Sequence, residues 1–300
     1  ERSDRGHVDI PRLIEGNVTL QVFTAVTKSP SGQNYEENSA ETFDNITLLA
    51  VGQLWPPRTW NSLLERALYQ AERLRDAANR SGGHLRLIRT EKDLDAVLAL
   101  REAGEEVVGG VLGIEGAHPL EGEISNLDRL EAAGYRLIGL HHFFDNELGG
   151  SLHGVGDAGL TDFGRQVVKE VAARGMILDL AHSSPQVARE VIEMTDMPLV
   201  VSHTGIRSHC DTKRNYPDDL MQAIAATGGV IGIGYWEDVT CDDSPLGVAR
   251  TIQAAIDLVG EDHVALGSDY DGTVTTGFDT AELAALTQAM LDIGLTEAQI

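Results

Sequence analysis

Seven nearly continuous apolar runs alternate with amphipathic helical segments along the chain. Because these runs show little polar alternation, they are typical of parallel strands that are buried on both faces. Between them, the segment 244–260 is typical of the predicted helices: Ser244 can cap its start, Pro245 fits its first turn and Gly260 ends it. This order predicts an α/β fold with a parallel sheet. The runs cover residues 18–26, 107–116, 136–143, 176–184, 198–205, 230–236 and 263–272.

The number of runs predicts the architecture. A TIM-type (β/α)8 barrel closes with eight strands, and a single barrel domain often has close to this length. An eighth candidate, residues 84–88, is short and interrupted by polar residues, and we interpret it as an accessory piece. We therefore expect residues 1–300 to form one (β/α)8 barrel domain that is one strand short.

The charge of the chain excludes several classes of partner. Its 23 basic residues stand against 47 acidic ones, which gives a net charge of −24. This balance argues against binding to nucleic acid or to anionic membrane surfaces. No apolar run reaches the ~18 residues of a membrane span, so we expect no transmembrane segment. No signal peptide is visible, although the sequence begins abruptly at its first residue.

One long polar excursion, residues 27–48, interrupts the alternation of strands and helices. An insertion at a strand end can form a wall of an active site, or it can be a tolerated loop. Composition does not decide between these two alternatives.

Residues that can bind metals or move protons follow the carboxyl ends of five of the seven predicted strands. In a parallel barrel these ends meet around one crevice, where such enzymes place their active sites. A single histidine at a strand end is usually structural, but that explanation does not fit five strands of one sheet. Histidine and carboxylate ligands without clustered cysteines indicate zinc or a similar divalent ion in an open catalytic site. The residues are Glu115, His141, His142, His182, His203, Asp269 and Asp271.

Four motifs then resemble the renal, or membrane, dipeptidase family of binuclear zinc hydrolases. They are GIEGAHPL (113–120), LDLAHSS (178–184), VVSHTGIRSHCDTKRNYPDD (200–219) and LGSDYDG (266–272). The resemblance runs from about residue 7 to residue 300, in the family's order and with similar spacing. It implies a metallodipeptidase of the membrane dipeptidase type, which hydrolyses small dipeptides with a metal-bound hydroxide and two zinc ions.

The resemblance also implies a metal-binding role for three residues. Glu115 matches the carboxylate that bridges the two metals, which makes physical sense because two neighbouring dications need an anion between them. His182 and His203 match the imidazole ligands of the second metal.

Further matches give the roles in catalysis and substrate binding. Asp269 matches the acid/base that moves the proton, and His142 matches the histidine that steadies the developing oxyanion of the substrate. The alternation of side-chain directions along a strand does not decide between His142 and its neighbour His141 for this role. Arg214 matches the arginine that holds the free carboxylate of the substrate, although by itself it would be an ordinary surface arginine.

Supporting roles follow from the same resemblance. Asp271 matches a supporting or structural acid, and His118 matches a residue that orients a metal ligand. Cys210 and Cys241 fall where mammalian relatives carry a disulfide, although two cysteines are too few for a disulfide framework. The compartment stays open, with a periplasmic or secreted location favoured over a cytoplasmic one.

In the stretch GHVDIPRL (6–13), His7 and Asp9 look like a pair of metal ligands, but the residues that follow Asp9 indicate otherwise. In the family, an Asp-Gly-His-Asn-Asp stretch ends the first barrel strand and supplies two ligands of the first metal. A later stretch, similar to His-Thr-Asp-Ile-Pro-Arg-Leu, leads into the second strand, and residues 10–26 match that lead-in. We therefore expect that His7 and Asp9 are not ligands. The chain then lacks its first strand and two of five protein ligands, and is incomplete at both ends.

Two rival functions remain at this point. A relative could hydrolyse another amide or a lactone, although Arg214 favours a substrate with a free carboxylate. A non-catalytic binding paralogue could keep the pocket without the first metal. A homodimer also stays open.

Overall fold

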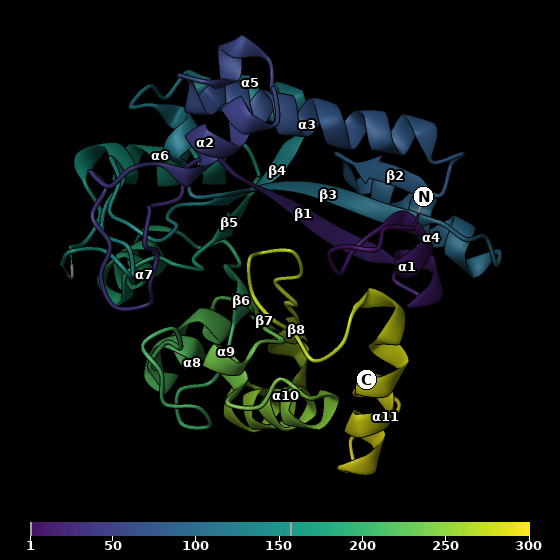
Figure 1. Ribbon diagram of the computed structural model, residues 1–300. Coiled ribbons are helices and arrows are strands. Elements are labelled where there is room, and N and C mark those ends of the chain that lie inside the picture. Colours follow the sequence, from purple (N-terminus) through teal and green to yellow (C-terminus); the bar gives the residue numbers. More distant parts are fainter. Residues whose placement is uncertain (1, 157) are drawn as a thin grey trace. The chain divides into compact units, whose positions relative to one another are not determined.

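The structure is a computed structural model that describes residues 2–156 and 158–300 and divides into two compact units. The large unit contains residues 19–195, and the small unit contains residues 2–18 and 196–300. Figure 1 labels the helices and strands of both units. Each unit is described separately below.

The large unit is built on five parallel strands with a central strand, β3. Residues of β3 pair with β1 along its length, with β2 through the first half of β3, and with β4 through the second half. Strand β5 pairs with β4. Because β2 lies off the order β1-β3-β4-β5, the prediction that residues 84–88 form an accessory piece is confirmed. The strands are β1 (Leu20–Val26), β2 (Leu85–Ile88), β3 (Val108–Glu115), β4 (Tyr135–Gly139) and β5 (Ile177–Asp179).

Helices connect these strands, and their buried faces follow the pattern of the sequence. In the helix that precedes β5, Val167, Val168 and Val171 are buried, and Thr161 caps its start by accepting a hydrogen bond from the Gly164 N–H. The helices are α2 (Asn45–Gly52), α3 (Leu63–Arg80), α4 (Glu91–Glu102), α5 (Asn126–Ala133), α6 (Asp162–Ala173) and α7 (Pro185–Met194), with short 3-10 turns at Pro57–Thr59 and His118–Leu120. Helices α3 and α5 lie against each other (Figure 1).

The small unit repeats the same α/β organisation with three parallel strands in sequence order. The predicted start of its longest helix is confirmed, because Ser244 accepts a hydrogen bond from the Gly247 N–H and Pro245 is the first helical residue. The strands are β6 (Val200–Thr204), β7 (Val230–Ile233) and β8 (Val264–Leu266). The helices are α1 (Ile10–Glu15), α8 (Asp218–Ala226), α9 (Glu237–Thr240), α10 (Pro245–Val259) and α11 (Leu283–Asp292), with 3-10 turns at Glu261–His263 and Thr280–Glu282.

Parallel strands joined by helices in both units confirm the predicted α/β fold. Among the described residues, no helix combines the length and the apolar character needed to cross a membrane.

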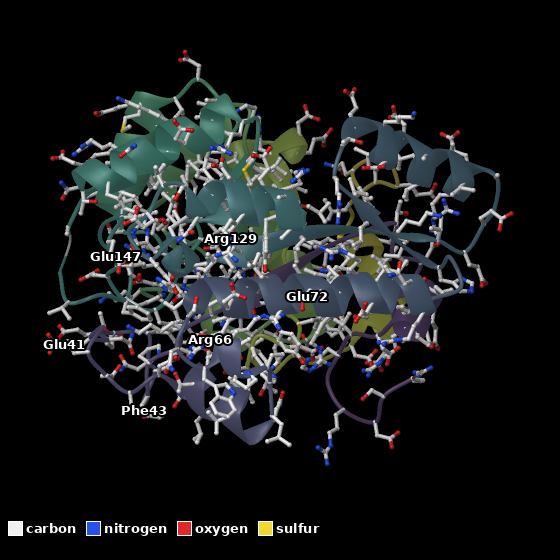
Figure 2. All side chains as sticks on the ribbon, turned by 90° about the horizontal axis from the view of Figure 1, so that it is seen from above. Glu41, Phe43, Arg66, Glu72, Arg129 and Glu147 are labelled. Carbon is white, nitrogen blue, oxygen red and sulfur yellow. A yellow bond between two sulfur atoms is a disulfide. The ribbon has the colours of Figure 1, made fainter. Side chains whose placement is uncertain are left out.

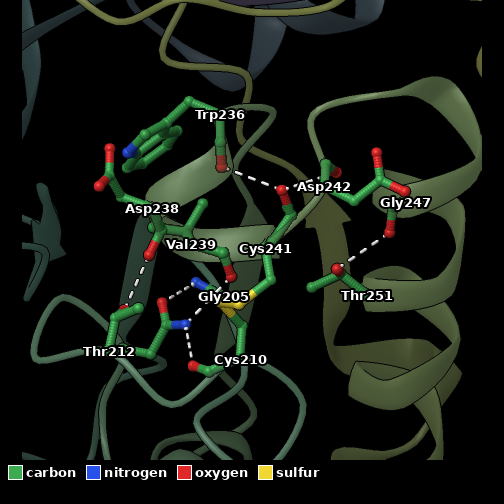
Figure 3. Close-up of a disulfide and its surroundings, with 12 residues drawn as sticks. Gly205, Cys210, Thr212, Trp236, Asp238, Val239, Cys241, Asp242, Gly247 and Thr251 are labelled. Carbon is green, nitrogen blue, oxygen red and sulfur yellow. Dashed lines mark hydrogen bonds between the residues drawn. A yellow bond between two sulfur atoms is a disulfide. The ribbon is translucent and has the colours of Figure 1, made fainter.

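A disulfide joins Cys210, in the loop after β6, to Cys241 at the end of α9 (Figure 3). The Cα atoms of the two cysteines are 5.6 Å apart. The Asn215 side chain reinforces this connection, because it accepts a hydrogen bond from the Gly205 N–H and donates to the carbonyls of Cys210 and Val239. The bridge that the family resemblance implied is therefore present, and it ties together the loops that follow two neighbouring strands.

A buried arginine holds the base of the residue 27–48 excursion in the large unit. Arg66 of α3 is 2% exposed and forms an ion pair with Asp44. Its guanidinium also donates to the Thr27 carbonyl at 2.8 Å and to the Thr47 hydroxyl at 2.7 Å. Figure 2 shows Arg66 on α3, next to the segment that carries Phe43. The polar insertion is thus anchored by a satisfied, buried charge rather than by apolar packing alone.

The disulfide predicts a measurable contribution to stability. Its cysteines are 31 residues apart in the sequence. The double change Cys210→Ala/Cys241→Ala should lower the free energy of unfolding by about 3–4 kcal/mol, because it releases a closed loop of this length in the unfolded chain. Urea unfolding of the oxidised protein and the variant would measure the difference. Equal unfolding midpoints would contradict the expectation.

The Arg66–Asp44 pair predicts a pH-dependent stability. Burial would raise the pKa of Asp44, but hydrogen bonds from Ser29, Thr47 and Arg66 and the charge of Arg66 together lower it. Arg66→Met should lower the free energy of unfolding by about 3–5 kcal/mol at pH 7, since it leaves the carboxylate without its partner. A carboxyl with a depressed folded-state pKa contributes its stability above the unfolded value of 3.8 and loses it as the pH falls through the folded value.

The difference between wild type and Arg66→Met should therefore shrink between pH 7 and pH 3 in urea unfolding experiments. Arg58→Met is the matched control, because Arg58 pairs with Glu65 and Glu72 at the surface of the same unit. It should change stability by no more than about 1 kcal/mol. A stability difference for Arg66→Met that stays constant with pH would count against a role for the Asp44 charge.

Candidate metal centre

Three side chains converge where three neighbouring strands of the large unit end. Glu115 is the last residue of β3, and His142 and His182 each lie three positions beyond the last residue of β4 and β5. A Glu115 oxygen lies 3.0 Å from His182 Nε2 and 3.8 Å from His142 Nε2. One donor atom from each residue lies within 4.8 Å of the others, and all three residues are buried. The structure therefore brings together three of the residues that the sequence singled out.

The chemistry of this donor set fits a divalent metal ion. Two imidazole nitrogens and one carboxylate oxygen are the ligands of choice for zinc and similar borderline ions. A buried carboxylate is costly unless a positive charge or hydrogen-bond donors compensate it. A bound cation would supply that charge and leave both imidazoles neutral, in the form that coordinates a metal.

The backbone is constrained at two positions of the cluster, Gly116 and His182. Gly116, directly after Glu115, has a φ of +83°, and a Cβ atom there would lie 2.7 Å from His118 Nε2 and 3.1 Å from His142 Cβ. His182 itself has a φ of +64°, in the left-handed region that costs a non-glycine residue about 1 kcal/mol or more. The backbone of His182 is thus locally strained where its imidazole lies next to Glu115.

The structure distinguishes His142 from His141, which the sequence did not. His141 Nδ1 lies 3.0 Å from the Ser183 hydroxyl, and complete burial lowers the pKa of His141 to about 3. His141 is therefore a neutral residue of the interior, while His142 faces Glu115.

His118 packs beside the cluster without joining it. Its ring stacks on Phe144 with a centroid distance of 4.6 Å, and its Nδ1 lies 3.2 Å from the Asn146 side-chain amide. Burial, and to a lesser degree the neighbouring His142 and His141, lowers the pKa of His118. This position supports the expectation that His118 assists a ligand rather than binding metal.

The small unit carries the other candidate residues. His203 is in β6, and its Nδ1 lies 2.8 Å from the Ser202 hydroxyl. Arg214 donates to the His203 carbonyl at 2.7 Å, and its guanidinium lies over the Trp236 ring. Asp269 has a φ of +56°, so a second candidate residue also adopts the left-handed conformation.

Arg214 differs from the other buried arginines in its lack of a counter-ion. Arg12 and Arg66 both pair with aspartates. Arg214 is only 2% exposed, yet no carboxylate among the described residues pairs with it. A buried guanidinium without a counter-ion is costly, which makes Arg214 a candidate for binding an anionic group.

His7 and Asp9 are engaged in local contacts of the small unit. Asp9 caps α1 and pairs with Arg12, whose Nε lies 2.9 Å from the carboxylate. His7 donates its N–H to Asp271, and the two side chains are 3.1 Å apart. These contacts support the expectation that His7 and Asp9 do not bind metal, and they give Asp271 a structural role.

The sequence did not identify His153 as a member of this neighbourhood. His153 is fully buried, and its ring centroid lies 5.5 Å from that of His182. His153 lies in a glycine-rich loop, away from any strand end. A search for polar residues that follow strand ends therefore could not find it. Tyr35 and Asn38 of the polar excursion hydrogen-bond to His153, which places that excursion beside the cluster, as a wall of the site would be.

Comparisons with known proteins add independent findings. The family model described as membrane dipeptidase (peptidase family M19) matches residues 1–300. Among curated proteins, the chain is similar to the dipeptidase aclJ of Aspergillus oryzae, with 34% identity over 203 residues. That match covers 63% of this chain and 47% of the relative, so the chain spans about half the length of that protein.

Solved structures show the same fold. The dipeptidase AC, a metallopeptidase of family M19, matches with a TM-score of 0.81 and 25% identity over 99% of this chain and 86% of that one. A metallopeptidase from Rhodobacter sphaeroides, liganded with a phosphinate mimic of the dipeptide L-Ala-D-Ala, matches with a TM-score of 0.80 and 24% identity. It covers 99% of this chain and 87% of that one, and at this identity the likeness shows the fold alone.

The cluster predicts a strong effect of Glu115 on metal affinity. Glu115→Gln removes the negative charge that faces both imidazoles, so zinc should bind at least about tenfold more weakly, a loss of ~1.4 kcal/mol or more. Elemental analysis after dialysis and competition with a chromophoric chelator would measure the loss.

Two variants serve as controls for this measurement. Glu102→Gln removes an exposed carboxylate at the end of α4 and should bind zinc as the wild type does. His7→Ala/Asp9→Ala should also keep its metal content, because both side chains are engaged elsewhere. A metal site emptied by this double change, with Glu115→Gln unaffected, would reverse the assignment of ligands.

Proposed function

This chain belongs to the membrane dipeptidase family, peptidase family M19, and from that membership we propose that it is a metal-dependent hydrolase that cleaves dipeptides. The observation that carries the proposal is the buried cluster of Glu115, His142 and His182 at the ends of three neighbouring parallel strands. Membership of this metallopeptidase family implies metal ions, and the cluster offers the donor atoms that such ions require.

We further propose zinc as the metal, with two ions in the complete centre. Glu115, His182 and His203 are the residues that we propose would hold these ions. We also propose that residues 1–300 belong to one (β/α)8 TIM-type barrel domain. The TM-score of 0.81 over 99% of the chain supports this proposal.

The residues of the chain have separate tasks in the proposed reaction. The bound metal ions would activate a water molecule and polarise the scissile carbonyl. Asp269 takes the proton from the attacking water and passes it to the nitrogen of the leaving amine. His142 donates a hydrogen bond to the oxygen that becomes negative in the transition state. The strained backbone at Asp269 suits a residue that is held in one orientation.

Arg214 supports the choice of substrate class. Its buried guanidinium has no carboxylate partner among the described residues, and a dipeptide brings a free α-carboxylate of the right charge. A charge-assisted pair in this position would favour free dipeptides over blocked ones. The same feature makes a neutral amide or a lactone a poorer substrate.

The activity of Arg214 variants tests this proposal. Arg214→Ala should lower kcat/KM for free-acid dipeptides by about 2–4 kcal/mol of transition-state stabilisation, which is roughly 30- to 900-fold. Dipeptides with an amidated C-terminus should be poor substrates for the wild type and should lose much less in the variant. Circular dichroism and zinc content should stay close to the wild type.

Arg207→Ala is a matched control in the same loop, because Arg207 donates to the carbonyls of Thr212 and Lys213. It should leave the preference for a free carboxylate intact. Unchanged kinetics of Arg214→Ala on free-acid dipeptides would remove Arg214 from the site. A wild-type protein that binds zinc but cleaves no dipeptide would favour a binding protein instead.

A further inference from the structure

The polar excursion begins at the edge of the candidate metal centre. In the pairing of β1 with β3, Val26 lies opposite Glu115, so the chain leaves β1 level with the cluster. We call residues 27–44 the β1–α2 loop. Its two ends are joined by a bridge between Pro30 and Asp44, and Asp44 is held by Arg66. The loop therefore has a fixed base beside the cluster.

Two asparagines give the far part of the loop a defined shape. The Asn38 side chain donates to the Asn34 carbonyl at 2.7 Å, and the Asn34 N–H donates to the Asn38 side chain at 3.0 Å. Asn38 is buried, although most of its neighbours in the loop are exposed. The loop is thus closed around Asn38, which becomes its point of attachment.

His153 is the residue to which this loop attaches. The Asn38 N–H and side-chain amide both donate to the His153 carbonyl, at 2.8 and 3.1 Å. His153 Nδ1 lies 2.8 Å from the Tyr35 carbonyl, and because a carbonyl can only accept, this nitrogen carries the hydrogen. Three hydrogen bonds between the loop and a completely buried histidine therefore fasten the loop.

The other side of His153 faces the candidate ligands. Its ring stacks on Phe143, with centroids 4.9 Å apart and an interplanar angle of 22°. The Phe143 ring in turn lies 4.9 Å from the His142 ring and 5.0 Å from the His182 ring. His153 also contacts the His182 ring edge-on at 5.5 Å. An unbroken series of ring contacts thus connects the loop to the imidazoles of His142 and His182.

We propose that His153 is a positioning residue that ties the β1–α2 loop to the imidazoles of His142 and His182, so that attachment of this loop sets the geometry of the metal centre. A metal site depends on the orientation of its ligand rings, and side chains that support the ligands commonly change metal affinity by about 10- to 100-fold. Close packing transmits a displacement of His153 to rings in direct contact with it. The proposal rests on the proposed function only in taking Glu115 and His182 as ligands and His142 as a residue of the same centre.

Three variants separate the links of this connection. Asn38→Ala removes the hydrogen bond from the Asn38 side chain to the His153 carbonyl and keeps the ring contacts of His153. His153→Phe keeps a ring on Phe143 and loses the bond to the Tyr35 carbonyl. His153→Ala removes both. His84→Phe is the matched control, because His84 Nδ1 also bonds a backbone carbonyl, that of Glu106, near the start of β3, about 23 Å of strand away from Glu115.

Two measurements on each purified variant give the test. A protease that cleaves after glutamate reports loop attachment, since Glu37 and Glu41 are exposed in the loop. Competition between the protein and a chromophoric chelator for zinc alone reports metal affinity. We expect cleavage to accelerate at least about tenfold in Asn38→Ala and His153→Ala, and by a smaller factor in His153→Phe. Zinc affinity should fall by about 10- to 100-fold in His153→Ala and by a smaller factor in Asn38→Ala and His153→Phe. The control should match the wild type in both.

The outcomes distinguish this inference from the proposed function. If the loop is released while every variant binds zinc as the wild type does, His153 holds the loop alone and the inference is wrong. Unchanged cleavage in Asn38→Ala and His153→Phe would also overturn it. Should His153→Ala fail to fold, these two milder variants decide the matter. If Glu115→Gln, measured in parallel, binds zinc normally, the metal centre itself is misassigned and both proposals fall.

Discussion

The structure of the large unit depends on one buried carboxylate that faces two imidazoles. Glu115 lies 3.0 Å from His182 and 3.8 Å from His142, in an interior where an uncompensated charge is costly. Its position follows from the pairing of β3 with its neighbours, because parallel strands in register end at the same edge. The glycine after it, the strained backbone of His182 and the neutral state of His141 all serve this arrangement.

The sequence predicted the architecture well where burial alone decides the pattern. Strands buried on both faces produce continuous apolar runs, so every predicted run contains a strand, and residues 84–88 were rightly interpreted as accessory. Strand lengths were less predictable. Strands β5 and β8 have only three residues each, because the rest of their apolar runs continues into the loops that carry His182 and Asp269. The number of apolar residues in a run therefore overestimates the length of the strand.

The candidate site was predictable to the extent that its residues follow strand ends. Glu115, His142 and His182 satisfy that condition, and they come together. The choice between His141 and His142 depends on the direction of each side chain after the strand, which is decided by a hydrogen bond to Ser183, 42 residues away. His153 could not be found in this way, because ring contacts with Phe143 and His182 relate it to the site and a hydrogen bond relates it to Asn38, 115 residues away. Such long-range contacts leave no periodic signal in a sequence.

The buried arginines differ in how their charge is compensated. The chain has far more acidic than basic residues, so a buried arginine has many carboxylates available as partners. Arg12 and Arg66 use such partners, and each thereby joins segments that are distant in the sequence. Arg214 is equally buried but instead lies over Trp236 and donates to the carbonyl of His203, a candidate ligand. No carboxylate among the described residues pairs with Arg214, and this contrast with Arg12 and Arg66 is the physical basis of the substrate-binding role that we propose for it.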